Sequence, residues 1–241
     1  MLQDFCCKGG AFASPHHGPK RLQTLYLVVH YTQITPLNKV LSHFQHPNNK
    51  VSCHYIIDAD GTCVEMIPHA LTAWHAGKSA WREHTHLNQT SIGIELVYTP
   101  YHRGAPFQPF PAAQMATLIQ LLKHLCQQYN LPPTAIIGHS DIAVGRKKDP
   151  GPSFPWSVLR QKGLGLSSAL CTQDEDQAFF AAPPPSYEQV RAWLWQIGYR
   201  FAPWQLPDAL WAFQSHFRAP WPSGTLDALT AARLYALART L

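Results

Sequence analysis

Short apolar segments before residue 140 constrain the fold more than any other feature of this sequence. Residues 25–30 (LYLVVH) are rich in Leu and Val, and residues 91–97 (SIGIELV) and 135–138 are similar. Apolar runs of this length favour buried strands. Residues 53–58 and 62–67 add two segments joined by the turn DADG, and Asp-Gly favours a tight hairpin because glycine accepts positive φ.

Helical segments are interspersed with these strands. We expect a short helix at residues 37–46 and a longer one at 112–129, which follows three prolines and carries apolar side chains at helical spacing. Strands first, mixed with a few helices, predict an α/β protein with one mixed central β-sheet flanked by helices.

The composition changes after Trp156. Residues 163–186 contain Gly, Ser, acidic residues and three consecutive prolines, which is typical of a linker. Residues 186–197, 206–217 and 226–241 predict three helices with mostly buried aromatic side chains. We therefore predict an N-terminal extension (residues 1–21), an α/β domain (22–171), a linker (172–185) and a small C-terminal three-helix domain (186–241).

The whole-chain properties exclude some classes. The 241 residues are 46% hydrophobic, as in globular proteins, and the net charge of +5 suits an anionic partner without identifying one. The sequence has no Lys/Arg run of the kind that marks a nucleic-acid-binding tract. It also has no apolar stretch that approaches the ~20 residues of a membrane helix. The N-terminus lacks the basic start and apolar centre of a signal peptide, so the chain is cytosolic as written or lacks its export signal.

Six cysteines form no CxxC pair, so we expect free thiols. The alternative is a disulfide between Cys53 and Cys63, which flank the predicted hairpin; it requires an oxidising compartment.

Three residues near the ends of predicted strands suggest a metal site. His30 ends an apolar strand, His139 follows another, and Asp149 lies ten positions later in a Pro/Gly-rich loop. Two imidazoles and one carboxylate are suitable ligands for a catalytic Zn²⁺, because they leave a fourth position for water. Spacing alone makes this a weak prediction.

Five sequence blocks strengthen this prediction. They are VVHYT (28–32), SCHYIIDADG (52–61), AWHAGKSAW (73–81), LNQTSIGIEL (87–96) and GHSDIAVGRKKDPGPSFPW (138–156). In these blocks and their order, the chain resembles the zinc amidases of the second N-acetylmuramoyl-L-alanine amidase family, which share the fold of peptidoglycan recognition proteins. The similarity covers roughly residues 22–166, and the two-domain, envelope-associated AmiD-type members are the most similar.

The resemblance implies a role for each matching residue. His30, His139 and Asp149 correspond to the ligands of one Zn²⁺ per chain, and residues 22–171 to the zinc amidase domain. Glu95 corresponds to the catalytic carboxylate and Lys147 to a basic catalytic residue. The alternatives are that Glu95 is a solvated strand-end carboxylate and that Lys147 belongs to a solvated basic loop.

Two further residues are candidates for substrate binding. The resemblance places His75 at the substrate groove, and Trp74 is a candidate for stacking on sugar or peptide. Packing roles are the alternatives for both. Residues 186–241 resemble a peptidoglycan-binding-like domain, with a structural cap as the alternative.

The implied activity is hydrolysis of the amide bond between N-acetylmuramoyl, including 1,6-anhydro-muramoyl, and L-alanine by zinc-activated water. The expected partners are peptidoglycan or muropeptides, without nucleic acid or a transmembrane segment, and the expected state is a monomer. The resemblance favours the cell envelope or periplasm, including outer-membrane association, and the N-terminus favours the cytoplasm. The alternative functions are a non-catalytic peptidoglycan-binding protein and a zinc peptidase, although no HExxH helix is present.

Overall fold

The computed structural model describes residues 13–20, 22–100, 108–166, 184–218 and 221–241. A central five-stranded sheet has the strand order β4-β3-β8-β2-β9. The four strands β3, β8, β2 and β9 pair in parallel, whereas β4 is antiparallel to β3. The predicted mixed sheet is therefore confirmed. Its strands are β2 (Tyr26–Tyr31), β3 (Tyr55–Ile57), β4 (Cys63–Glu65), β8 (Ser91–Leu96) and β9 (Ile136–Gly138).

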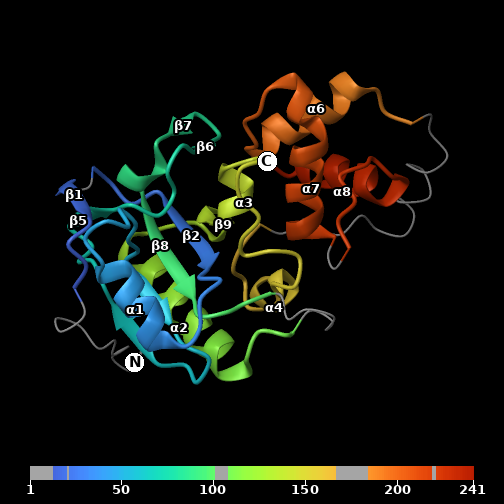
Figure 1. The fold of residues 1–241 in the computed structure, drawn as a ribbon. Helices are drawn as coiled ribbons and strands as arrows, with labels where there is room; N and C mark the ends of the chain where they lie inside the picture. The colour runs from blue at the N-terminus through green and yellow to red at the C-terminus, as the bar shows by residue number, and fades with distance from the viewer. Residues whose placement is uncertain (1–12, 21, 101–107, 167–183, 219–220) are drawn as a thin grey trace.

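Helices cover both faces of this sheet (Figure 1). Helix α2 (Ala112–Gln128) packs its apolar stripe on one face, against Leu27 and Val29 of β2. Successive strand side chains point to opposite faces, so His30 points away from α2. Helix α1 (Leu37–Gln45) packs near β3 and β4 on this second face. The second face therefore carries both His30 and helix α1.

The connections confirm the predicted hairpin and add two short helices. The Gly61 N–H donates to Asp58 at 3.0 Å, and Gly61 has φ +89°, as a tight turn between β3 and β4 requires. The one-turn helix α3 (His139–Ile142) follows β9 directly, and α4 (Trp156–Gln161) follows the Pro/Gly-rich loop.

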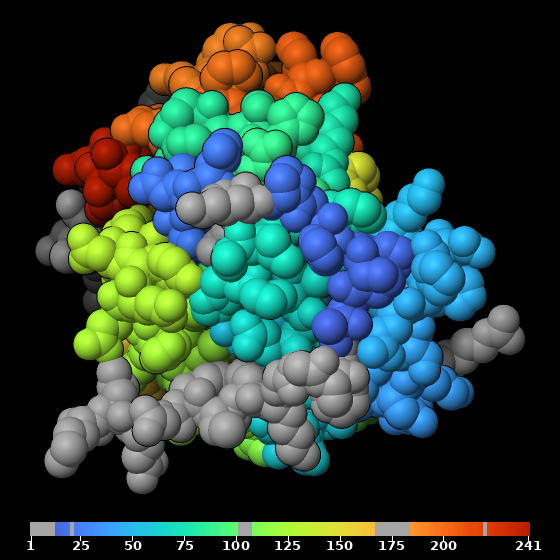
Figure 2. All heavy atoms as spheres, turned by 90° about the vertical axis from the view of Figure 1, so that its left-hand side faces the viewer, coloured from blue at the N-terminus to red at the C-terminus, as the bar shows by residue number. Residues whose placement is uncertain are grey.

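Two small strand pairs were not predicted from the sequence. β1 (His17–Lys20) pairs with β5 (Leu71–Ala73), and β6 (Ala80–Trp81) pairs with β7 (His84–Thr85). In Figure 2 the blue segment around β1 lies against the teal and green segments that carry these strands. The described part of the predicted N-terminal extension therefore packs on the α/β domain.

The three predicted C-terminal helices are α6 (Tyr187–Ile197), α7 (Leu206–Phe217) and α8 (Ala228–Arg239). They share one hydrophobic cluster with Tyr26 and Val28 of the sheet and with Trp81. Gly198 ends α6, and a Cβ there would lie 2.5 Å from the Trp81 ring. The helical segment is thus joined to the α/β domain through a common core, while most of the predicted linker lies outside the described residues.

Several aromatic side chains of this segment differ from the prediction of a mostly buried set. Trp204 is 81% exposed, Trp221 73% and Trp195 47%. Phe213 and Phe217 are buried as expected. These three tryptophans therefore present much of their ring surface to solvent.

The cysteines and the helix lengths settle two further expectations. Cys53 is a buried free thiol whereas Cys63 is disulfide-bonded, so the two do not pair with each other and the expectation of free thiols is wrong for Cys63. None of the described helices is long and apolar enough to cross a membrane.

Candidate metal centre

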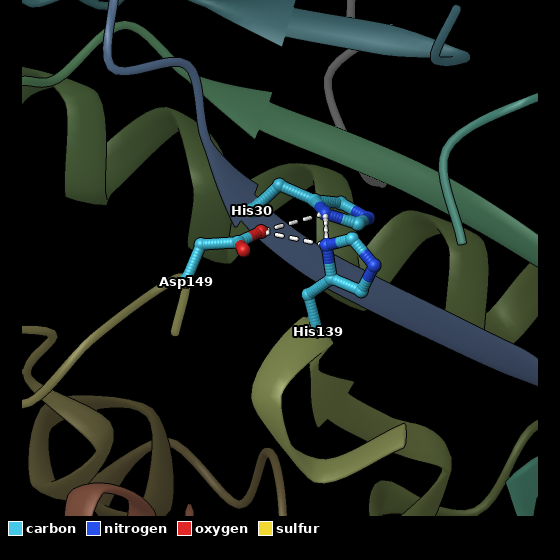
Figure 3. A group of neighbouring side chains, drawn as sticks. All are labelled: His30, His139 and Asp149. Carbon is cyan, nitrogen blue, oxygen red and sulfur yellow. Dashed lines mark hydrogen bonds and ion pairs between the residues drawn. The ribbon is translucent and has the colours of Figure 1, made fainter. Parts of the chain in front are cut away.

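His30, His139 and Asp149 meet at one buried point (Figure 3). The Nδ1 atoms of the two histidines are 3.0 Å apart, and each lies 2.9 Å from Oδ2 of Asp149. The three residues are 1%, 3% and 8% exposed. The ends of the parallel strands β2 and β9 bring the histidines together, because β2 pairs with β9 and α3 begins directly after it.

The loop that carries Asp149 is tied to the same helix. The Ser140 N–H donates to the Asp149 carbonyl at 2.8 Å. A Cβ on Gly138 would lie 2.8 Å from Pro150, so glycine allows the loop to pack closely against the β9–α3 junction. The backbone therefore holds Asp149 next to His139.

The protonation states favour metal binding. Burial, followed by the charge of His139, lowers the pKa of His30 to about 4. Burial alone would raise the pKa of Asp149, but His139 and His30 together hold that pKa well below its usual range. Neutral imidazole nitrogens and an ionised carboxylate are the donor set that zinc takes at catalytic sites, so the residues fit this metal.

Glu95 lies beside this group. It pairs in register with His30 on the adjacent parallel strand, so both side chains point to the same face of the sheet. It is 8% exposed, and its Oε2 has no hydrogen-bond partner among the residues that the structure describes. Burial and then the charge of Asp149 raise the pKa of Glu95, while Lys147 lowers it. Glu95 can therefore take up a proton near the metal position.

The basic triplet next to Asp149 divides into three roles. Arg146 donates to the carbonyls of Ala76 and Lys78 at 2.6 and 2.7 Å. Lys148 places its Nζ 3.8 Å from the centre of the Trp211 ring in α7. Lys147 is exposed, and its charge lowers the pKa of both His30 and Glu95. Lys147 therefore acts by its charge on His30 and Glu95, while the charge of Arg146 interacts with Asp149.

His75 and Trp74 occupy different surroundings. His75 is 6% exposed, and its Nδ1 lies 2.9 Å from Nε2 of His30, which places it behind the ligand and not in an open groove. Burial and the neighbouring histidines keep its pKa well below the usual value. Trp74 is half-buried, with its ring 5.8 Å from that of His16. Trp74 therefore remains accessible to a ligand, whereas His75 supports His30.

Sequence reasoning missed the polar residues that support this centre. Asn88 Oδ1 accepts hydrogen bonds from the backbone N–H groups of His75 and Ala76 at 3.1 and 2.7 Å. Ser91 Oγ lies 3.2 Å from Nε2 of His75. The block LNQTS was the available signal, since it places polar residues directly before a buried strand.

A mixed sheet that carries two histidines and an aspartate beside a buried glutamate is the arrangement of a metal-dependent hydrolase. Residues 20–152 match the family described as N-acetylmuramoyl-L-alanine amidase, and the chain belongs to this family.

Individual relatives extend the similarity to the C-terminal helices. The chain is 36% identical over 229 residues to N-acetylmuramoyl-L-alanine amidase AmiD of Escherichia coli, covering 88% of this chain and 81% of AmiD. The fold matches AmpDh3 of Pseudomonas aeruginosa in complex with anhydromuramic pentapeptide, with a TM-score of 0.82, 33% identity and coverage of 90% and 92% of the two chains. It also matches E. coli AmiD in complex with the substrate anhydro-N-acetylmuramic acid-L-Ala-D-gamma-Glu-L-Lys, with a TM-score of 0.79, 34% identity and coverage of 91% and 90%.

Proposed function

We propose that this chain hydrolyses the amide bond between N-acetylmuramic acid and L-alanine, using one Zn²⁺ held by His30, His139 and Asp149. The observation that carries the proposal is the convergence of these three ligand atoms next to Glu95. A bound zinc ion supplies Lewis-acid chemistry and lowers the pKa of a coordinated water to about 7. The full ligand set disfavours the alternative of a binding protein without activity.

The protein residues supply proton transfer and charge. Glu95 accepts the proton of the attacking water and delivers it to the leaving nitrogen of L-alanine, a task that suits a buried carboxylate with a raised pKa. Lys147 faces the negative charge that develops on the carbonyl oxygen, where one such donor contributes about 2.7–4 kcal/mol. No covalent intermediate is required.

We propose muropeptides, including those with a 1,6-anhydro sugar, as substrates. The solved relatives AmpDh3 and AmiD are described with anhydromuramic peptides. A cavity of about 440 Å³ lies beside the ligand loop and is lined in part by Lys78, Arg146 and Arg200. Their positive charge suits the carboxylates of a stem peptide. Trp74, at the end of β5, is the proposed stacking residue for sugar or peptide.

The proposed compartment is the cell envelope. The disulfide at Cys63 supports it, because disulfides persist in oxidising compartments. The similarity to AmiD-type amidases agrees with this location. We further propose that the chain acts as a monomer.

Product analysis tests the reaction. Purified muropeptides, with and without the anhydro sugar, are incubated with the enzyme, and mass spectrometry identifies free stem peptide. Chelation is expected to abolish turnover, and added Zn²⁺ to restore it. Glu95→Gln is expected to keep zinc and lose roughly 10²–10⁴-fold in kcat. Full turnover by protein verified to be free of metal, or cleavage inside the peptide, contradicts the proposal.

We also propose that the exposed tryptophans of the helical segment bind the wall. Deleting the segment is a poor test, because it would expose the core that it shares with the sheet. Instead, Trp204→Ala and Trp221→Ala are expected to weaken sedimentation with insoluble peptidoglycan while turnover of soluble muropeptides is unchanged. Trp193→Ala, at a half-buried position, is the comparison. Unchanged sedimentation of the exposed variants supports a structural cap.

A further inference from the structure

His75 links the ligand His30 to a fixed hydrogen-bond acceptor in the backbone. Its Nδ1 lies 2.9 Å from Nε2 of His30, and its Nε2 lies 3.2 Å from Oγ of Ser91. Ser91 in turn donates its hydroxyl proton to the carbonyl of Leu87 at 2.5 Å. Ser91, His30 and His75 are 0%, 1% and 6% exposed, so bulk water does not compete for these bonds.

The direction of the protons follows from the chemistry of the last acceptor. A backbone carbonyl can only accept, so the hydroxyl of Ser91 must donate to Leu87. The Ser91 oxygen is then left to accept from Nε2–H of His75, and the unprotonated Nδ1 of His75 accepts from Nε2–H of His30. A neutral imidazole has one protonated nitrogen. The lone pair of His30 is therefore on Nδ1, the atom that faces His139 and Asp149.

We propose that Ser91 and His75 form a relay that holds His30 in its Nε2–H tautomer and so presents the Nδ1 lone pair to the metal. His75 is thus a positioning residue. The inference rests on the proposed metal centre, because it assigns the relay its purpose.

The second histidine ligand is oriented from the same segment. Nε2 of His139 lies 3.3 Å from the carbonyl of Ala76, which again leaves Nδ1 unprotonated. Asn88 fixes the backbone of both His75 and Ala76. Residues 75 and 76 therefore set the tautomers of both histidine ligands, which outer hydrogen bonds of metal sites commonly do.

Gly93 makes room for this arrangement. It lies in β8, two residues before Glu95, and a Cβ on it would lie 2.3 Å from the ring of His75. A side chain at this position would displace the imidazole from His30. The space over Gly93 is therefore part of the relay.

Two measurements on the full chain test the relay. Long-range ¹H–¹⁵N correlation spectra of metal-free protein with labelled histidines report which nitrogen of His30 carries the proton. Competition with a chromophoric chelator gives the dissociation constant for Zn²⁺. In the wild type we expect His30 to be protonated on Nε2. His75→Leu is expected to mix the tautomers and to weaken zinc binding about 10–100-fold.

Matched variants separate the relay from general packing. His75→Asn retains an acceptor that can face His30 and is expected to restore most of the affinity. Ser91→Ala removes one oxygen and is expected to shift the tautomers of His75 and His30. Ser52→Ala is the control, because this buried hydroxyl also bonds the same segment, at the N–H of Trp74, but does not reach His30. We expect no change in tautomer for it.

The outcomes are distinct. A wild-type His30 protonated on Nδ1 overturns the relay, as does wild-type zinc affinity in folded His75→Leu. If His75→Leu does not fold, Ser91→Ala decides through the spectra: unchanged tautomers overturn the proposal. Absence of zinc binding by the wild type contradicts the proposed function, while the metal-free spectra still decide the relay.

Discussion

Two buried clusters of histidine and aspartate meet at the one-turn helix α3. His139 at its first position belongs to the candidate metal centre with His30 and Asp149. Asp141, two residues later, bonds instead to His216 of α7 and to Tyr199, which follows α6. We call the second set, Asp141, Tyr199 and His216, the interface cluster. The residue types are similar, but the arrangement of protons differs.

Every oxygen of Asp141 receives a proton donor. The Tyr199 hydroxyl donates to Oδ1 at 2.7 Å, and the Gly138 N–H and His216 Nδ1 reach Oδ2 at 2.8 and 2.7 Å. The Asp141 carboxylate is thus satisfied, although Nε2 of His216 has no hydrogen-bond partner among the described residues, and such a buried network stabilises the fold without a metal. It joins the α/β domain to the C-terminal helices.

The candidate metal centre differs if the proposed relay holds. With both imidazoles protonated on Nε2, as the relay requires, three electron-pair acceptors would face one another at 2.9–3.0 Å. This arrangement is repulsive until a cation occupies the point where they converge. We infer that the two clusters differ less in residue type than in how many N–H and O–H donors reach the carboxylate, because the interface cluster has such donors and the proposed relay removes them from the candidate metal centre.

The largest expected effect is on zinc affinity, and it comes from a substitution in the candidate metal centre alone. Asp149→Asn replaces one of the three proposed protein ligands. Structural zinc sites bind the ion with about 10–16 kcal/mol, so we expect the loss of one ligand to cost about 3–5 kcal/mol, or roughly 10²–10⁴-fold in affinity. Chelator competition measures it. Asp60→Asn, the same change in the exposed β3–β4 turn, is the control and should bind zinc normally. Wild-type zinc affinity in Asp149→Asn would contradict the assignment of Asp149 as a ligand.

The next largest effect is on the free energy of unfolding, and it comes from a substitution in the interface cluster alone. His216→Leu fills a similar space but removes a hydrogen-bond partner from the buried Asp141 carboxylate, and leaving a buried charged group without such a partner costs about 3 kcal/mol or more. Urea unfolding measures the free energy of unfolding, and metal analysis of the folded protein should still find one zinc per chain. His124→Leu, on the exposed side of α2, is the control. If His216→Leu has the same free energy of unfolding as the wild type, the interface cluster does not stabilise the fold, which contradicts the structural role assigned to it.

The two clusters also differ in how far the sequence could predict them. His30 and His139 were predictable because each ends an apolar segment, and parallel strands bring such ends together. Asp149 was a weak candidate from its place in the Pro/Gly-rich loop, which the family blocks strengthened, and Glu95 was identified only through those blocks. The contact between Asp141 and His216 spans 75 positions, and no local pattern predicts it. For the same reason, the sequence did not indicate that His75 lies behind His30.

The missed strands have a physical reason as well. β1 has the sequence HGPK, and glycine and proline are disfavoured in strands, while β6 and β7 have two residues each. Pairing with β5 overrides these propensities in β1. The longer strands and helices were predicted to within a few residues because their apolar spacing extends over the whole element.

A smaller change measures cooperation inside the interface cluster. Tyr199→Phe removes one hydrogen bond to a buried carboxylate and is expected to cost about 1.5–3 kcal/mol in the free energy of unfolding. Combined with His216→Leu, it should give a coupling energy above about 0.5 kcal/mol, because both groups bond the same side chain. Strict additivity in urea unfolding would show that Tyr199 and His216 act independently.

The smallest effect depends on pH and concerns Glu95. Because its pKa is raised in the folded protein, Glu95 stays protonated in the native state above pH 4.5 while the unfolded chain loses this proton. The free energy of unfolding therefore falls as pH rises from 4.5 toward the folded pKa, by up to ~1.4 kcal/mol per pH unit. Glu95→Gln lacks this loss, so the metal-free variant should become more stable than the metal-free wild type as pH rises.

Urea unfolding of both proteins from pH 5 to pH 8 measures the difference, in which the contributions of the other titrating groups cancel. Saturating zinc should reduce the difference, because a cation near Glu95 favours its ionised form. The interface cluster provides the internal comparison: its carboxylate already has donors on both oxygens, so zinc should leave the destabilisation by Tyr199→Phe unchanged. Parallel pH profiles for wild type and Glu95→Gln would mean that Glu95 holds no proton in the metal-free protein over this pH range, which contradicts its raised pKa.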